Sequence, residues 1–154
     1  MSTTEETECR RVVFAFANAI NNWEIIEYIL YRVAIGQHVS PARTALVAGL
    51  TKATHADRHK DIFLRYIYPR DRKYGTIPGG PAMAGRDGSF YEVRLETIQS
   101  VTFRNAKTAE VVTDWGHFLP GGPTMFVLKK KADVWLIDSL KSKDEHGGWR
   151  AVPI

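Results

Sequence analysis

Asp114 and His117, which flank Trp115, have side chains that can accept or donate a proton. Asp114, Trp115 and His117 lie within four residues of one another, and Asp138 follows on the next predicted hairpin. A carboxylate or imidazole enclosed in an apolar pocket can take a shifted pKa and act as a general acid or base. The spacing also suits a simple loop leading to Pro120. We therefore name four residues as candidates to line a cavity: Asp114, Trp115, His117 and Asp138.

Two histidines have the spacing of a metal-binding helix. His55 and His59 occur in the run His-Ala-Asp-Arg-His, which would place both imidazoles on one helix face, as in zinc proteases. Ala56 occupies the position of the glutamate that serves as general base in those enzymes, and no convincing third ligand follows. We therefore expect a surface or capping role for both histidines, and we predict neither a metal nor a cofactor.

The densest mixture of basic and aromatic residues follows a predicted helix end. It consists of Arg65, Tyr68, Arg70, Arg72, Lys73 and Tyr74. Arginine and tyrosine are residue types that anchor protein–protein interfaces. Cations at a helix C-terminus also interact favourably with the helix dipole, and both roles can hold at once. The patch is our candidate protein-binding surface.

Lysines at 129–131, 141 and 143 raise the question of phosphate contacts. Acidic residues lie among them, at Asp133, Asp138, Asp144 and Glu145, and cancel much of their field. We interpret the lysines as solvated strand ends that blunt a sheet edge. Nucleic acid is therefore not the partner that we expect.

Helical periodicity dominates residues 4–70. Apolar residues recur at three- and four-residue spacing from Val12 to Trp23 and again from Ile25 to Val33, with Asn21-Asn22 as a point where one helix could become two. Gly36 suits a helix stop. Ser40-Pro41 has the form of a capped helix start, and a further helix over 55–68 should end before Pro69.

Breaking residues fill 71–89, where Pro-Gly-Gly-Pro and Asp-Gly predict a long structured loop. Residues 90–154 follow a strand pattern, with runs at 91–95, 98–103, 109–115, 124–130 and 134–140. The last two form a predicted hairpin around Ala132-Asp133, and 149–154 is an edge strand or a packed tail. Over Val134–Ile137 apolar residues occupy alternate and intervening positions alike, so we expect both sheet faces to be at least partly covered there.

Helices followed by antiparallel strands predict a single α+β domain over 1–154, with the helices on one face of the sheet. The chain of 154 residues is long enough to bury its own core. Its formal charge is +4, and its one cysteine, Cys9, permits no internal disulfide. The polar, acidic start and the lack of a long apolar run predict a cytoplasmic protein without a membrane span.

Three stretches together resemble the NTF2-fold immunity proteins of bacterial polymorphic toxin systems. They are DIFLRYIYPRDRKYGTIPGGP, FYEVRLETIQSVTFRNAKTAEVVTDW and MFVLKKKADVWLIDSLKSKDEHGGW, within roughly residues 60–150. The resemblance implies an NTF2-like cone, in which a strongly curved antiparallel sheet packs against N-terminal helices. It also implies a non-catalytic inhibitor that binds a cognate toxin. It carries five residues onto this chain: Arg72, Tyr91, Trp135, Asp138 and Trp149.

Tyr91 joins the cavity candidates through this resemblance, whereas Trp135 and Trp149 are expected to pack in the core or at its rim. The net positive charge departs from the acidic character of many nuclease inhibitors. The toxin would then either not be a basic nuclease or be held by a local acidic patch. The alternative is a small-molecule binder or a SnoaL- or ketosteroid-isomerase-like enzyme that uses Asp114, His117 or Asp138. A homodimer through the open sheet face is a further option.

Overall fold

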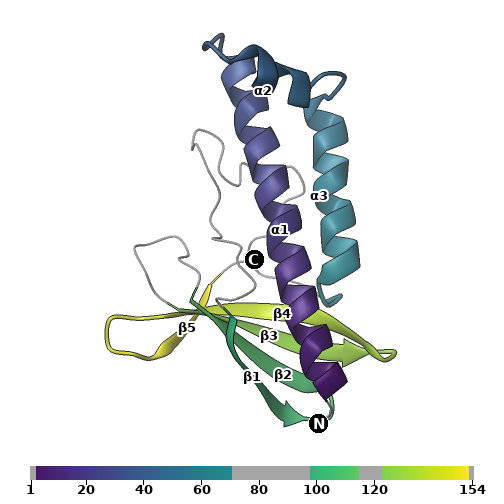
Figure 1. Cartoon of the computed structure of the whole chain (residues 1–154), viewed down its shortest axis with the longest axis vertical. Coiled ribbons are helices and arrows are strands. Elements are labelled where there is room, and N and C mark those ends of the chain that lie inside the picture. The colour runs from purple at the N-terminus through teal and green to yellow at the C-terminus, as the bar shows by residue number, and fades with distance from the viewer. Residues whose placement is uncertain (1–2, 71–97, 115–122, 153–154) are drawn as a thin grey trace.

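The computed structural model describes residues 3–70, 98–114 and 123–152, and its fold is α+β (Figure 1). Three helices come first: α1 (Thr3–Ala34), α2 (Pro41–Leu46) and α3 (Lys52–Tyr66). Five strands follow: β1 (Ile98–Asn105), β2 (Thr108–Thr113), β3 (Thr124–Lys131), β4 (Val134–Lys143) and β5 (Trp149–Val152). They form one antiparallel sheet in the order β1-β2-β3-β4-β5.

Helix α1 runs unbroken for 32 residues, so Asn21-Asn22 does not divide it. A helix of that length extends for ~48 Å. Five strands spaced about 4.8 Å apart make a sheet only ~20 Å wide. The first half of α1 therefore crosses the sheet, and its second half extends beyond the sheet beside α3, with α2 at the far end (Figure 1).

Side-chain caps fix where α2 and α3 begin. The Ser40 hydroxyl accepts a hydrogen bond from the Arg43 backbone N–H, and Pro41 takes the first helical position, as predicted. Thr51 and Thr54 form a capping box at the start of α3, each hydroxyl bonded to the other residue's backbone N–H. Helix α3 thus begins three residues earlier than predicted.

The end of α3 is joined to the sheet. Ile67 forms a parallel β-bridge with Ile137, and the Tyr68 backbone N–H donates to the Ile137 carbonyl at 2.8 Å. The helix therefore ends at Tyr66 rather than just before Pro69, because the backbone that follows is extended and bonded to β4. This junction places the C-terminal residues of α3 beside the β3–β4 hairpin.

The β3–β4 hairpin turns at Ala132-Asp133, as predicted, and the two φ angles of 48° and 62° suit the right-handed twist of the strands. Further along the hairpin, Val127 pairs with Ser139, whereas Leu128 pairs with Ile137. Asp138 is the extra residue of the resulting β-bulge. Bulges re-aim side chains and often occur beside functional sites.

The core lies between the first half of α1 and one face of the sheet. Its buried members include Val13, Phe16, Ala17, Phe126, Leu128, Trp135, Ile137 and Leu140. Trp135 is a core residue, as expected, and Trp149 is half-buried on the edge strand β5 with the Lys143 ammonium 5.6 Å from its ring centre. In the described part of the chain, the buried core residues belong to one hydrophobic cluster that extends from α1 across the sheet to β4.

Over 134–137 both faces of β4 are at least partly covered, as predicted: Trp135 and Ile137 are buried on one face, and Leu136 is half-buried on the other, although Val134 there is 50% exposed. On β3, consecutive residues are buried from Thr124 to Leu128. One sequence-based expectation about the sheet is wrong. The lysines at 129–131 do not blunt an edge, because β3 is the middle strand of the five.

These lysines are also not simply solvated. The Lys130 ammonium pairs with the Glu5 carboxylate of α1 and lies 5.3 Å from the ring centre of Trp135. Lys129 pairs with Asp138. The hydrogen bond to Glu5 raises the pKa of Lys130. The cations at this strand end therefore tie α1 and β4 to β3.

The five strands form an open sheet with β1 and β5 at its two edges, and a closed cone is not formed by the described residues. The predicted strand at 91–95 and the predicted loop at 71–89 lie outside those residues. Within the described ranges, every helix is either too short or too polar to cross a bilayer.

Candidate protein-binding groove

A groove lies where the end of α3 meets the β3–β4 hairpin. Its volume of about 510 Å³ is within the range of protein sites that hold ligands. The described residues that line it are Phe63, Leu64, Ile67, Tyr68, Pro69, Arg70, Lys131 and Leu136. The groove therefore depends on the bridge between Ile67 and Ile137, which brings two distant parts of the sequence together.

Apolar side chains form much of the groove. Phe63 and Ile67 also pack against the core, whereas Leu136 is half-buried and Leu64 is 81% exposed. Leu64 is the most exposed large apolar residue in the described part of the chain. A single exposed leucine is ordinary, but a leucine at the mouth of an apolar groove adds to a surface that a partner can cover.

A charged network at Asp138 forms the polar side of the site. Arg70 donates from Nε to the Asp138 carboxylate at 2.8 Å and from Nη2 to its backbone carbonyl at 3.1 Å. The Lys129 ammonium lies 3.4 Å from the other carboxylate oxygen and 5.6 Å from the ring centre of Tyr68. Because Asp138 is buried, its contacts hold the flexible Arg70 and Lys129 side chains in place before any partner binds.

Lys131 differs from these two cations. It lines the groove, its side chain is exposed, and none of the described carboxylates is close enough to form an ion pair with it. Arg65 is also exposed, on α3, but it does not line the groove. The cationic rim thus combines a fixed guanidinium at Arg70 with an ammonium at Lys131 that has no such anchor.

The structure brings three predicted site residues together: Tyr68, Arg70 and Asp138. Tyr68 and Arg70 were predicted for a protein-binding surface and Asp138 for a cavity, so two separate hypotheses meet at one place. The remaining candidates, apart from Arg65 and Asp114, lie outside the described residues: Arg72, Lys73, Tyr74, Tyr91, Trp115 and His117.

Asp114 and Asp138 do not share a site. Asp114 is exposed immediately after β2, whose last residue, Thr113, pairs with Thr124 of β3. Thr124 pairs in turn with Ser142, four residues beyond Asp138 on β4. At about 3.3 Å per residue, Asp138 lies more than ~13 Å from that end of the sheet. The two carboxylates are therefore separated, and these two cavity candidates do not belong to one site.

The expected surface or capping role of the two histidines is wrong, because His55 and His59 are buried between α1 and α3. The His55 ring stacks on Trp23 with 4.6 Å between ring centres and 2° between planes. Trp23 Nε1 donates to the His55 carbonyl at 2.8 Å, and His55 Nε2 donates to the Trp23 carbonyl at 2.9 Å. This reciprocal pair anchors the two helices to each other.

The tautomer of His55 follows from these bonds. A carbonyl oxygen can only accept, so Nε2 carries the proton, and Nδ1 is buried without a hydrogen-bond partner among the described residues. Burial lowers the pKa of His55 and of His59, which favours the neutral rings. The Glu27 carboxylate lies 3.4 Å from His55 Nε2. Among the described residues, no cluster of three or more potential ligands is arranged to hold a metal ion.

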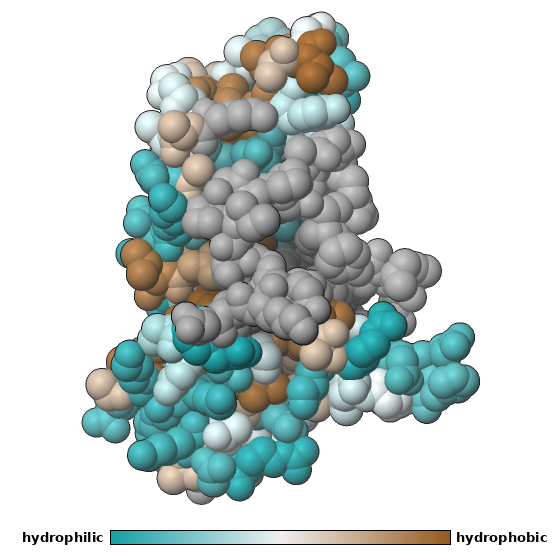
Figure 2. Space-filling model, turned by 180° about the vertical axis from the view of Figure 1, so that it is seen from behind, coloured by the Kyte–Doolittle hydropathy of each residue, from teal (hydrophilic) through white to brown (hydrophobic). Residues whose placement is uncertain are grey.

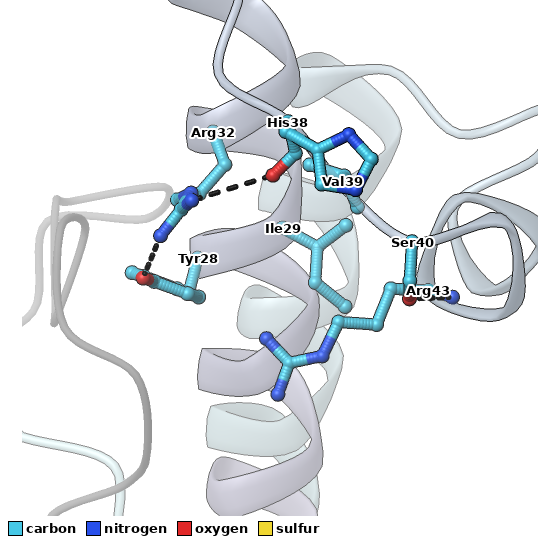
Figure 3. Close-up of a pocket in the computed structure, with 7 residues that line it drawn as sticks. All are labelled: Tyr28, Ile29, Arg32, His38, Val39, Ser40 and Arg43. Atoms are coloured by element: carbon cyan, nitrogen blue, oxygen red, sulfur yellow. Dashed lines mark hydrogen bonds between the residues drawn. The ribbon is translucent and has the colours of Figure 1, made fainter.

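A second, smaller pocket of about 280 Å³ lies at the far end of the helices (Figure 3). Tyr28, Ile29 and Arg32 of α1 line one side, and residues 38–40 and Arg43 line the other. Arg32 donates to the Tyr28 hydroxyl at 2.7 Å and to the His38 carbonyl at 3.3 Å. These bonds hold the segment after α1 against the helix. The pocket is therefore explained by the way the chain turns back at this point, without a ligand.

Leu64 and Leu136 were not among the predicted site residues, and Lys129 and Lys131 were predicted to be solvated. Leu64 follows Ile62 and Phe63, which face the core, and a helical projection would have placed it on another face. The roles of Lys129 and Lys131 depend on the register of the hairpin, where Lys129 pairs with Leu136. Sequence spacing alone does not reveal which side chains the end of α3 meets.

In comparisons with known proteins, no family model, no curated protein and no solved structure matches the chain.

Proposed function

We propose that the protein is an immunity protein that binds a cognate bacterial toxin through this groove and neutralises it by steric occlusion. The observation that carries the proposal is the preorganised Arg70–Asp138–Lys129 network beside an apolar groove with the exposed Leu64 at its mouth. An apolar centre next to fixed arginine and tyrosine side chains has the composition of an interface hot spot. Inhibition by occlusion requires slow release rather than turnover, which rigid anchors favour.

The state of Asp138 supports binding over the alternative of an enzyme. Both carboxylate oxygens are engaged by cations, Arg70 on one and Lys129 on the other. A general base must come within hydrogen-bond distance of the proton that it removes, and the buried Asp138 carboxylate is already covered by these two side chains. Asp114 is exposed and distant from Asp138, so it supplies no desolvated acid beside it.

The NTF2-like cone is part of the same proposal. The order of helices before strands supports it, as does the packing of α1 across one face of an antiparallel sheet. Both features agree with the resemblance of residues 60–150 to the immunity proteins. The cytoplasm is the compartment in which such an inhibitor would meet a toxin that enters or is made in the cell.

The experiment is a growth-rescue assay with the toxin module encoded beside the gene for this chain. Co-expression of the wild-type chain should restore growth, and calorimetry should show a direct complex. Leu64→Glu should weaken the complex about 30-fold or more, as expected for a hot-spot residue that loses about 2 kcal/mol. The charge replaces an exposed side chain, so the circular dichroism spectrum and the unfolding midpoint should stay close to wild type.

Leu46→Glu is the matched control, because Leu46 is 59% exposed on α2, far from the groove. It should bind and rescue like the wild-type chain. Arg72→Ala and Tyr74→Ala test the remainder of the predicted surface by the same calorimetry. A wild-type chain that neither binds nor rescues, or a Leu64→Glu variant with undiminished affinity, would refute the proposal for this groove.

A further inference from the structure

The cations of the groove are not balanced by the carboxylates that the structure places there. Arg70 and Lys131 line the groove, and none of the described lining residues is acidic. The Asp138 carboxylate lies beside the groove, but it is shared between Arg70 and Lys129. The exposed Lys131 thus contributes positive potential at the mouth of an apolar cavity.

We propose that the segment bound in the groove is an acidic stretch of polypeptide that inserts one apolar side chain. The inference rests on the proposed function and specifies the chemistry of its partner. The apolar side chain would pack between Leu64 and Leu136, and carboxylates beside it would meet Lys131 and the outer face of Arg70. Complementary charge of this kind steers association and excludes partners with a basic surface.

The apolar lining separates this partner from a nucleic acid. Phosphate-binding sites combine cations with aromatic platforms for bases, or they present a helix to a groove. Here the two described aromatic rings that line the groove are already engaged: Phe63 packs against His59 and the core, and the Tyr68 ring centre lies 5.6 Å from the Lys129 ammonium. Leu64, Ile67 and Leu136 offer dispersion contacts that suit an aliphatic side chain but not a phosphate.

The chain itself, with its methyl groups labelled for NMR, tests the proposal directly. The probes are three short synthetic peptides: a leucine flanked by glutamates, the same leucine flanked by lysines, and the acidic peptide with serine in place of leucine. The acidic leucine peptide should shift the methyl resonances of Leu64 and Leu136 in a saturable manner. The basic peptide and the serine peptide should bind at least several-fold more weakly.

Lys131→Glu should weaken binding of the acidic leucine peptide by about two- to five-fold, the range of an exposed ion pair, and remove most of its salt dependence. Lys107→Glu makes the same charge change in the exposed β1–β2 turn and should have no effect. Equal binding of the basic peptide, an unchanged affinity of Lys131→Glu, or stronger groove shifts with a DNA duplex would each overturn the inference.

The same variants separate this inference from the proposed function. If the toxin loses affinity for Leu64→Glu but binds Lys131→Glu and wild type equally, the groove stands and the acidic segment is wrong. If the toxin binds Leu64→Glu as tightly as wild type, the proposed function of the groove fails, whatever the peptides show. If both variants weaken the complex and Lys107→Glu does not, both proposals are supported.

Discussion

The first half of α1 packs on the sheet through apolar side chains, whereas its second half packs on α3 around a stacked tryptophan and histidine. In the sheet-bound region, Val13, Phe16 and Ala17 meet β-strand residues such as Phe126 and Leu128. In the outer region, Trp23 exchanges two hydrogen bonds with His55 and lies 4.7 Å from the ring of His59. One helix thus joins a conventional core to a smaller aromatic and polar one.

The outer region should open more readily than the sheet-bound core. The outer region exposes apolar residues, with Val33, Ile35 and Leu46 each close to or above half exposure. Figure 2 shows apolar surface at the outer end of the helices and a mainly hydrophilic surface over the sheet. Regions with little buried apolar area open at a lower free energy than the core. The groove lies beside the sheet, in the region that should open less readily.

The largest effect should come from the sheet-bound core. Phe126 is fully buried on the central strand, so Phe126→Ala removes a ring and leaves a cavity between β3 and α1. We expect a loss of about 3–5 kcal/mol in the free energy of unfolding, measured by urea titration. Leu46→Ala in the outer region should cost less than about 0.5 kcal/mol. Similar losses for both variants would contradict the division into two regions.

Sequence periodicity predicted much of this fold, because local chemistry specifies its parts. Ser40-Pro41 carries its own cap, and the Ala132-Asp133 turn is bounded by two apolar runs. The unbroken α1 could not be predicted, since Asn21-Asn22 is tolerated in a helix whose face is buried on both sides of the pair. Tertiary packing decided that point, as it often does for weak local signals.

The candidate site was predictable in part, for a related reason. Tyr68, Arg70 and Asp138 were identified by residue type, but their meeting depends on a bridge between residues 70 positions apart in sequence. The bulge that aims Asp138 depends on the register of the hairpin. The burial of His55 follows from the contact of α3 with Trp23, which no spacing within α3 encodes. A single sequence does not reveal which distant residues pair in this way.

A second prediction concerns the outer region. Trp23→Phe keeps an aromatic ring against His55 but removes the Nε1–H that donates to the His55 carbonyl. Loss of a buried hydrogen bond of this kind should cost about 1–2 kcal/mol. Hydrogen exchange should quicken for amides of α2 and the first half of α3, while amides of β3 keep their protection. Trp149→Phe, at the half-buried rim, is the control.

If Trp23→Phe lowers the protection of β3 as much as that of α3, the two regions unfold as one unit. The outer region would then have no lower opening free energy than the sheet-bound core. An unchanged exchange rate in both regions would show instead that the reciprocal bonds between Trp23 and His55 contribute little.

Acid should weaken the outer region by a smaller amount. His55 and His59 have pKa values below the ordinary 6.5, chiefly because they are buried, so the unfolded chain binds protons more readily than the folded one. Their contribution to stability is therefore complete above about pH 6.5 and is lost as the pH falls below it. Between pH 7 and 6 each histidine should cost at most about 0.7 kcal/mol, the limit for a ring that stays neutral in the folded state. Glu27, Arg58 and the second histidine are the charged or titratable groups around His55.

His59→Phe should remove part of this pH dependence, because a phenyl ring keeps the contacts with Trp23 and Phe63 but cannot bind a proton. His146→Gln changes an exposed histidine in the β4–β5 turn and should leave the pH dependence as it is. Urea titrations at a series of pH values provide the measurement. A stability that is flat from pH 7 to 5, or that rises in acid, would contradict the assignment of neutral buried rings.

The smallest effect should come from the ion pairs on the surface of α1. Arg11 donates two hydrogen bonds to Glu8, one turn before it, and the bond lowers the pKa of Glu8. Because both side chains are well exposed, Glu8→Gln should cost only about 0.3–0.5 kcal/mol, and 1 M salt should abolish the difference. A larger loss that persists in salt would mean that Glu8 acts through packing rather than through charge, because 1 M salt screens an exposed ion pair. The ion pair that joins this half of α1 to the sheet is the one between Glu5 and Lys130, which Glu8→Gln leaves in place.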